Sequence, residues 1–328
     1  MPPPGLFVIL RCFSAPYKGI PYMKFCISIL LILAFLNLPV KAQVFLQPAK
    51  TYDASRANGV ALAEGILFTG TIIALHSLWY KNFHHSRFHF FNDNGEWLQM
   101  DKLGHACTAY NVGALGTDVY RWTGIDNQHA IWYGGLTGLL FLTTVEIFDG
   151  FSSGWGFSGG DMIANTAGTA LVVGQYLGWN EQRIQLKFAY HRTIYPSYRP
   201  DQLGSNPAQS WLKDYNGQSY WISGNIASFL PSNTNFPSWL NVSFGYGADG
   251  MISARKNSDA PISADGTTPV FERSRRFFLA PDVDFTRIHT DDPAITAIFK
   301  TINIFKVPAP TLEFRPGLKK WKLHPLYF

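Results

Sequence analysis

Proline divides this sequence of 328 residues into two parts that cannot fold alike. No proline occurs between Pro48 and Pro196, whereas thirteen occur from Pro196 to Pro325. Proline lacks the backbone N–H and clashes inside a helix, so the first region is free to be helical and the second is not. We predict an α+β chain in which about four apolar helices precede a β-rich region that is also rich in proline and aromatic residues.

Apolar runs in the proline-free region predict four helices, at residues 56–80, 99–122, 127–148 and 159–179. Their uncharged spans are at the short edge of what crosses a bilayer, so length does not settle whether they cross. Gly134-x-x-x-Gly138 and Ala164-x-x-x-Gly168 place small residues on one helical stripe. This spacing predicts close helix packing, and a chance spacing in an ordinary buried bundle is the alternative.

After Arg183 the pattern changes to alternating apolar and polar residues, which is typical of strands. The aromatic C-terminus is a feature shared with outer-membrane barrels. Pro325 lies inside this last segment, so a sheet or hairpins that cap the helices are favoured over a barrel. Strands are predicted within residues 185–190, 220–229, 239–246, 276–280 and 311–315.

A secretory leader is predicted at the N-terminus. From Met23, the expected true start, a short basic stretch precedes an apolar core and a small-x-small pattern that ends at Ala42. This pattern is typical of a signal peptide cleaved before Gln43. We therefore expect a leader at residues 1–42, a helical region at 43–182 and a β-rich region at 183–328.

Removal of this leader would change the charge and cysteine content. Arg11, Lys18, Lys24 and Lys41 would be lost, which leaves 23 basic and 22 acidic residues, a net charge of about +1. A nucleic-acid partner is therefore not indicated. Aromatic residues at 16% beside charged residues at 15% favour a protein at a membrane. Cys107 would be the remaining cysteine, so an intrachain disulfide is not expected.

Polar residues gather at the ends of three of the apolar runs. Burying an ionisable group costs several kcal/mol unless it is paired, so we predict that these helix ends meet at one site. The patterns are Asp101-Lys102-x-x-His105, Glu146-x-x-Asp149 and Ser158-x-x-Asp161-x-x-x-Asn165.

Each pattern has a structural and a functional interpretation. Glu146 and Asp149 near the end of a helix oppose its dipole, which predicts a compensating cation or a shared proton, with Lys102 and His105 as candidates. Ser158 and Asp161 also fit an ordinary helix N-cap. Asn165, one turn deeper, has no such structural reason.

These motifs resemble the DUF2279 family of uncharacterised envelope proteins, which is YfiM-like, and more distantly the VanZ-like membrane proteins. The resemblance covers roughly residues 99 to 180, and the segment 213–221 resembles an extension carried by Bacteroidetes members. The resemblance implies an envelope location. The family has no established activity, so the resemblance implies none for this chain. The sequence has no lipobox, and short members lack the β-rich tail. The matching residues are Asp101, Lys102, His105, Glu146, Asp149, Ser158, Asp161, Asn165 and Gly168.

Two functions remain open. In the first, the cluster is a structural network in a membrane-associated envelope protein, and the β-rich tail binds a membrane lipid or an envelope protein. In the second, the protein is a metal-assisted hydrolase or transferase that acts on an envelope lipid or glycan, with His105, Asp101, Lys102 and Glu146 as catalytic residues. Glu146, Asp149 and Asp161 would then bind a divalent cation such as Mg²⁺ or Ca²⁺. The periplasmic face or the outer membrane is favoured over the inner membrane.

Overall fold

A computed structural model describes residues 46–77, 84–231, 233–259 and 270–327. These residues lie almost entirely in one compact unit, Pro48–Asp291 with Ile295–Phe328. The predicted leader at residues 1–42 lies outside the described residues.

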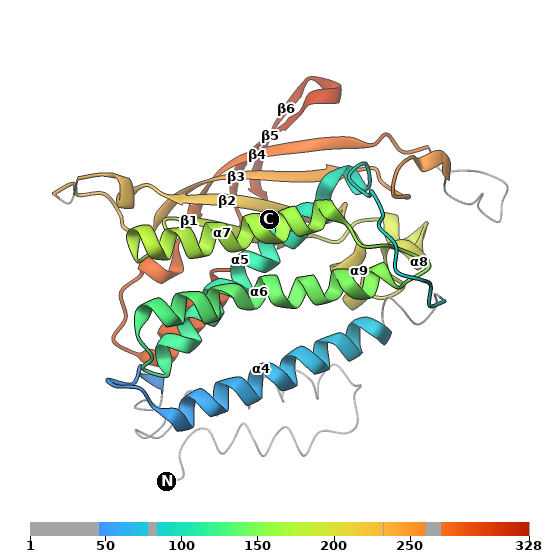
Figure 1. Ribbon diagram of the computed structural model, residues 1–328. Helices are drawn as coiled ribbons and strands as arrows, with labels where there is room; N and C mark the ends of the chain where they lie inside the picture. The colour runs from blue at the N-terminus through green and yellow to red at the C-terminus, as the bar shows by residue number, and fades with distance from the viewer. Residues whose placement is uncertain (1–45, 78–83, 232, 260–269, 328) are drawn as a thin grey trace, which may run out of the picture. The chain divides into compact units, whose positions relative to one another are not determined.

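Four long helices form one layer of this unit (Figure 1). Capping residues determine where three of these helices begin. Asp53, Asp126 and Ser158 each accept a hydrogen bond from a backbone N–H in the first turn of the helix that follows. The α+β prediction is confirmed. The count of four apolar helices is not, since short helices α8, Pro200–Leu203, α9, Pro207–Lys213, and α10, Pro293–Ile302, follow later. The long helices are α4, Ala54–Leu75, α5, Met100–Trp122, α6, Asn127–Gly150, and α7, Gly159–Trp179.

Two of the described helices, α4 and α6, are long and apolar enough to cross a membrane by length and composition. They differ in how far the unit buries them. In the most apolar stretch of each helix, 6% of the residues are buried in α4 and 33% in α6. Helix α4 therefore presents most of its apolar surface outside the packed unit, with Val60 as its one buried residue among those described.

Close helix packing is confirmed at the predicted small residues. A Cβ atom added to Gly134 would lie 2.2 Å from the backbone of Gly116, and one added to Gly138 would lie 2.5 Å from the Ala109 carbonyl. On α7, a Cβ atom at Gly168 would lie 2.1 Å from the Ala106 carbonyl oxygen. Backbones at this separation leave no room for a side chain, so α5 is held at a fixed register against α6 and α7.

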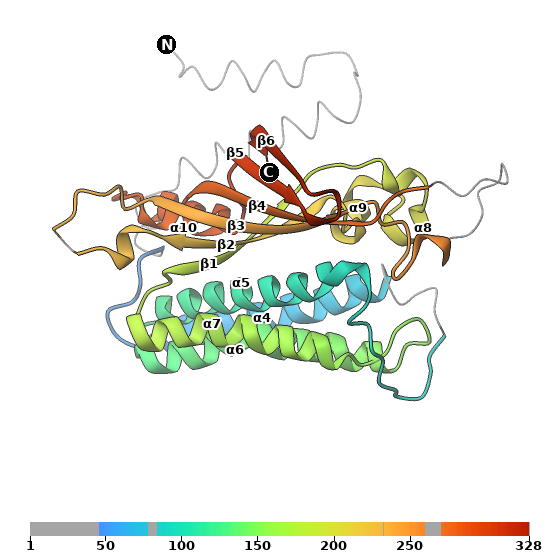
Figure 2. The same ribbon diagram turned by 90° about the horizontal axis from the view of Figure 1, so that it is seen from above.

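The second layer is a six-stranded antiparallel sheet in the order β1-β2-β3-β4-β5-β6 (Figure 2). All five predicted strands are present. The sixth was not predicted, because Pro325 lies within it. Proline is tolerated there because β6 is the last strand in the order. The pairing of β5 with β6 also shifts in register between Ala309 and Thr311 of β5, opposite this part of β6. The strands are β1, Ile184–Tyr190, β2, Gln218–Asn225, β3, Leu240–Asp249, β4, Ser274–Val283, β5, Ala309–Arg315, and β6, Lys320–Tyr327.

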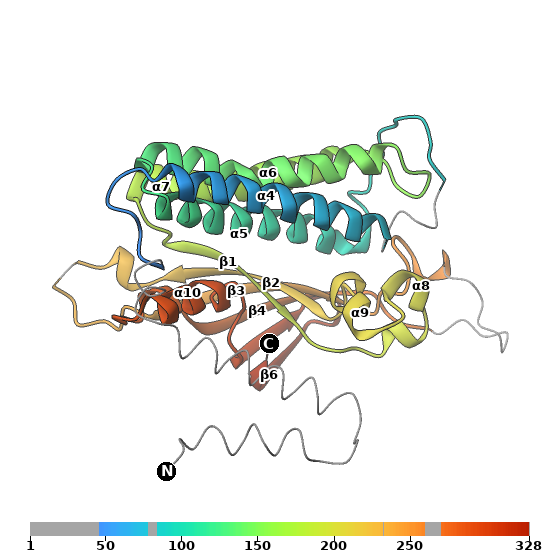
Figure 3. The ribbon, with the colours of Figure 1, turned by 90° about the horizontal axis from the view of Figure 1, so that it is seen from below.

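Helix α5 joins the two layers (Figure 3). The Tyr110 hydroxyl donates a 3.2 Å hydrogen bond to the Ile184 carbonyl, and Asn111 Nδ2 donates one of 2.9 Å to the Leu186 carbonyl. Near the start of α5, the Tyr246 hydroxyl on β3 donates to the Leu98 carbonyl at 2.6 Å. The first turn of α5 is therefore fixed by the sheet as well as by the other helices.

Candidate functional site

The predicted polar cluster forms at the first two turns of α5. Asp101, Lys102 and His105 lie there on one side of the helix, and α6 and α7 bring Glu146 and Asp161 beside them. Glu146 is 1% exposed and Asp161 is 3% exposed. Ionisable groups this deeply buried require partners, and the cluster provides them.

Lys102 is the central cation. Its Nζ lies 2.6 Å from Asp93 Oδ2, 2.8 Å from Asp161 Oδ1 and 3.3 Å from Asp101 Oδ2. The three carboxylates come from the segment before α5, from α5 itself and from α7. One ammonium group therefore holds three chain segments together through charge-assisted contacts.

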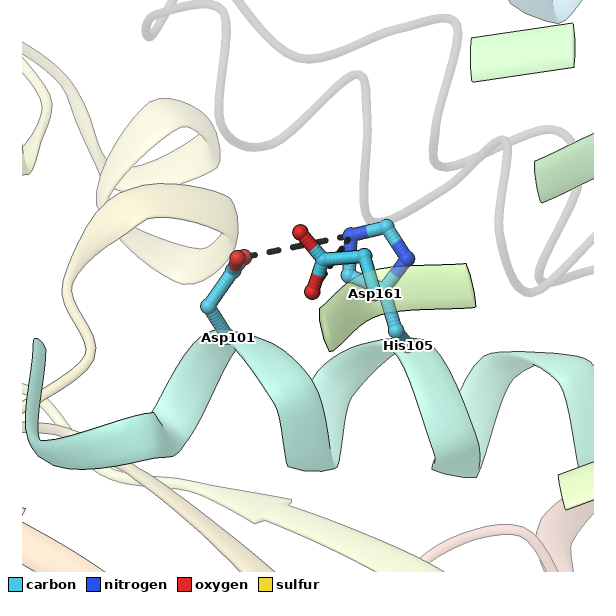
Figure 4. Close-up of side chains that lie close together, drawn as sticks. All are labelled: Asp101, His105 and Asp161. Carbon is cyan, nitrogen blue, oxygen red and sulfur yellow. Dashed lines mark ion pairs between the residues drawn. The ribbon is translucent and has the colours of Figure 1, made fainter. Parts of the chain in front are cut away.

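The His105 ring is held at one nitrogen and open at the other. Nδ1 lies 3.0 Å from Asn165 Oδ1, which can only accept, so Nδ1 carries a proton. Nε2 faces three carboxylate oxygens without reaching hydrogen-bond distance: Glu146 Oε1 at 3.8 Å, Asp161 Oδ1 at 3.9 Å and Asp101 Oδ1 at 4.0 Å. Figure 4 shows the ion pairs that join the ring to Asp101 and to Asp161.

Glu146 is tied to the start of α7. Its Oε2 accepts the Ser158 backbone N–H at 2.9 Å, and the Ser158 hydroxyl donates to Asp93 Oδ1 at 2.6 Å. The same hydroxyl accepts the Asp161 backbone N–H at 3.1 Å, so the predicted N-cap is confirmed. Ser158 thus serves as a helix cap and as a link between two carboxylates.

Asn165 is fully buried, and its Nδ2 has no hydrogen-bond partner among the residues that the structure describes. Its Oδ1 is occupied by His105. A buried amide with one satisfied side and one unsatisfied side carries a desolvation cost. Asn165 is also the residue that orients the His105 ring, so this orientation is obtained with a desolvation cost.

Burial and charge shift the pKa values in opposite directions within the cluster. Burial raises the pKa of Glu146 to about 8 and, with the nearby charge of Asp101, that of Asp161 to about 6. Burial would raise the pKa of Asp101, but His105, Lys102 and the Tyr215 hydroxyl together lower it. Burial would also lower the pKa of His105, but the surrounding carboxylates raise it overall. Neutral pH therefore favours a protonated Glu146, and the charges of Asp101 and Asp161 shift the neighbouring imidazole toward its protonated form.

A cavity of about 180 Å³ opens over one side of the cluster. Asp101, His105 and Asp161 form part of its lining, together with the predicted Asp149. Its walls include four aromatic residues, Phe91, Trp97, Trp155 and Tyr215. The segment between α6 and α7, which contains Gly154 and Gly156, therefore brings Asp149 and Asp161 to one cavity.

The grouping of candidate metal ligands differs from the predicted one. Among the described residues, the ligand atoms that lie within 4.8 Å of one another belong to Asp101, His105 and Asp161. Asp161 was in the predicted metal set, whereas Glu146 and Asp149 do not join this group. Sequence reasoning also missed Asp93 and Tyr215. Asp93 lies in the turn Asn92-Asp93-Asn94-Gly95, where an acid has an ordinary local role, and Tyr215 is 114 residues from its partner.

The fold and site define a helical domain with a buried polar cluster, packed against an antiparallel sheet. Residues 89–176 match the family described as "Predicted periplasmic lipoprotein (DUF2279)", which supports the DUF2279 resemblance over this segment. The match covers the whole polar cluster except Tyr215. The description supports a cell-envelope location. No curated protein and no solved structure matches the chain.

Proposed function

We propose that this is a membrane-associated envelope protein in which the polar cluster is a structural network that fixes the helices against one another and against the sheet. The observation that carries this proposal is the position of Lys102 Nζ, within 3.3 Å of carboxylates from three chain segments. One of these carboxylates, Asp101, also accepts from Tyr215, which leads into β2. Networks that fix register are an attested use of buried polar groups.

Membrane association is supported by the surface of α4. Exposed contiguous apolar surface marks interaction sites with proteins or membranes. We place the protein at the periplasmic face of a membrane or at the outer membrane, with a lipid or an envelope protein as its partner. The exposed apolar residues of α4 include Leu62, Ile66, Leu67 and Ile73.

Separate replacement of His105 and Glu146 tests the structural role. The changes His105→Leu and Glu146→Leu keep a side chain of similar size and remove the polar atoms that Asn165 and the Ser158 N–H contact. A structural network predicts that both lower the melting temperature, because each leaves buried partners unpaired. Asp201→Asn is a matched control, since Asp201 is exposed and its ion pair with Arg199 lies outside the cluster. Unchanged stability in both cluster variants, with loss of a cellular phenotype, would contradict the structural role.

A second candidate function is metal-assisted hydrolysis or group transfer on an envelope lipid or glycan. The observation in its favour is the group of Asp101, His105 and Asp161 at the cavity. Two carboxylates and an imidazole are suitable ligands for a divalent cation, which would supply a Lewis acid. Two features oppose it: Lys102 already neutralises Asp161 at 2.8 Å, and the raised pKa of His105 makes a proton compete with a metal for Nε2.

Metal analysis of the purified protein separates the two functions. The measurement is the bound Mg²⁺, Ca²⁺ and Mn²⁺ per chain in the unaltered protein, in Asp161→Asn and in Asp201→Asn. Stoichiometric metal that is lost in Asp161→Asn and kept in Asp201→Asn would establish the metal-dependent function. Metal-free protein whose melting temperature falls in Asp161→Asn supports the structural network.

A further inference from the structure

The two faces of the sheet differ in composition and in burial. The strand register aligns two apolar rows across all six strands on one face. We call the first the aliphatic row, because five of its six residues are aliphatic; it consists of Leu186, Ile222, Phe244, Leu279, Leu312 and Leu323. We call the second the aromatic row; it consists of Phe188, Tyr220, Tyr246, Phe277, Phe314 and Trp321.

The helical layer covers only part of this apolar face. Leu186 packs against the core formed by α5 and α7, and Tyr220 and Tyr246 pack around Met100 at the start of α5. Further along the rows the side chains are open to the surroundings. Phe244 is 61% exposed, Trp321 is 65% exposed and Leu323 is 71% exposed.

The opposite face of the same sheet is buried and combines ion pairs with a small apolar cluster of Trp221, Phe278, Ala280 and Tyr327. Lys187 Nζ lies 2.9 Å from Asp282 Oδ2, and both side chains are fully buried. Arg276 donates two hydrogen bonds to Glu313, of 2.8 and 3.2 Å. A sheet with one solvent-exposed face normally buries its apolar side chains and exposes its polar side chains. This sheet instead buries ion pairs on one face and leaves part of an apolar face exposed, as does a sheet whose outer face meets lipid.

The β5–β6 hairpin adds positive charge at one end of the apolar face. Lys319, Lys320 and Lys322 are exposed, and the structure gives these lysines no ion pair among the described residues. Lys320 and Lys322 alternate with Trp321 along β6 and so project from its other face, where their long flexible stems can carry the ammonium groups past this exposed strand. The sequence from Pro316 to Phe328 contains no acidic residue. Tryptophan beside lysine is the combination that favours the interface between lipid headgroups and hydrocarbon. The charge of this hairpin complements an anionic lipid surface.

We infer that the exposed part of the aliphatic and aromatic rows inserts shallowly into a bilayer leaflet, with the lysines of the β5–β6 hairpin at its anionic headgroups. This inference rests on the membrane association proposed above and names the surface that makes the contact. The occupant is a lipid surface rather than a second copy of the chain, because three clustered lysines without acids would repel their own copies across a symmetric contact.

A fluorescent reporter on the hairpin tests this assignment. An environment-sensitive dye is attached to Leu323→Cys in the full chain, with Cys12 and Cys26 changed to Ser and the buried Cys107 left in place. The labelled protein is mixed with vesicles of phosphatidylcholine alone or of phosphatidylcholine with phosphatidylglycerol. The expected result is a blue shift that requires phosphatidylglycerol and weakens with salt. A dye at Val270→Cys, where the side chain is 98% exposed, should show no shift.

Charge variants give the matched comparison. Lys320→Gln with Lys322→Gln should lower partition onto the phosphatidylglycerol vesicles about 25-fold, at roughly fivefold per lysine. Lys50→Gln with Lys256→Gln removes the same charge from exposed positions elsewhere and should leave partition nearly unchanged. Melting temperatures of all variants should agree, because these lysines are exposed.

Three results would overturn the assignment. Vesicle binding without a dye shift at residue 323 would reject this surface and leave membrane association intact. Absence of binding to either vesicle would reject both. A dye shift that depends on protein concentration and not on lipid would assign the apolar face to a second copy of the chain.

Discussion

The Tyr215 hydroxyl donates a 2.6 Å hydrogen bond to Asp101 Oδ1 across 114 residues of sequence. Asp101 begins the polar cluster on α5, and Tyr215 lies just before β2. The contact is buried and charge-assisted, so it couples the geometry of the cluster to the position of the sheet.

Loss of this hydroxyl should destabilise the protein measurably. Tyr215→Phe removes one hydrogen bond to a carboxylate and keeps the ring, so we expect the free energy of unfolding to fall by about 1.5–3 kcal/mol. Chemical denaturation measures this change. Tyr198→Phe is the control, because Tyr198 is 45% exposed and its ring contact with Phe271 does not use the hydroxyl. Equal stability of the two variants would show that the contact contributes nothing.

The raised pKa of Glu146 predicts a stability that falls with rising pH. The folded protein holds the Glu146 proton up to about pH 8, whereas the unfolded chain releases it near 4.5. Folding is therefore disfavoured progressively as pH rises through that window. The raised pKa of His105 acts in the same direction, since its proton is also held more tightly in the folded state. Thermal unfolding should show a decline that Glu146→Gln flattens. An identical pH slope in Glu146→Gln would contradict this assignment.

Two glycines on α7 should respond oppositely to the same change. Gly168→Ala places a methyl group 2.1 Å from the Ala106 carbonyl oxygen, so we expect a loss of about 1–3 kcal/mol from overpacking. Gly174→Ala meets nothing within 4 Å and should gain about 0.5–1 kcal/mol from higher helix propensity. Denaturant midpoints of both variants measure the difference. Similar midpoints would mean that α7 does not pack closely on α5.

Cys107 should be unreactive in the folded protein. The thiol is buried, and burial raises its pKa to about 12, so little thiolate is present at neutral pH. A thiol-alkylating reagent should label it only after denaturation, as mass spectrometry of the intact chain can show. The exposed thiol of Leu323→Cys serves as a positive control in the same reaction. Rapid labelling of Cys107 under native conditions would contradict the packing of α5.

The elements of this fold were largely predictable because their signals are local. Charge-free periodic runs located the long helices, and alternation located five strands. The capping role of Ser158 followed from its spacing to Asp161. The strand β6 was missed because Pro325 is unfavourable within a sheet in general, and only its place in the strand order makes it acceptable.

The partners within the site were less predictable because they depend on three-dimensional contact. The sequence indicated that Asp101, His105, Glu146 and Asp161 meet, and the structure brings them together. It did not indicate that Lys102 would pair with Asp93 and Asp161 rather than with Glu146. That pairing depends on the relative positions of the helix ends in the folded protein. The metal prediction with Glu146 and Asp149 remains untested.

The turn that precedes α5 has a consequence for the order of folding. Trp97, Leu98 and Gln99 have φ values of 46°, 50° and 65°, a left-handed run that costs side-chain-bearing residues about 1–3 kcal/mol each. Hydrogen bonds from Tyr246 and Arg275 to the Leu98 carbonyl hold this turn, and both donors belong to the sheet. The helices can form early from local contacts, but the start of α5 can take its final course only after β3 and β4 have paired. A chain cut after α7 should therefore keep its helices and relax this turn, and with it the arrangement around Lys102.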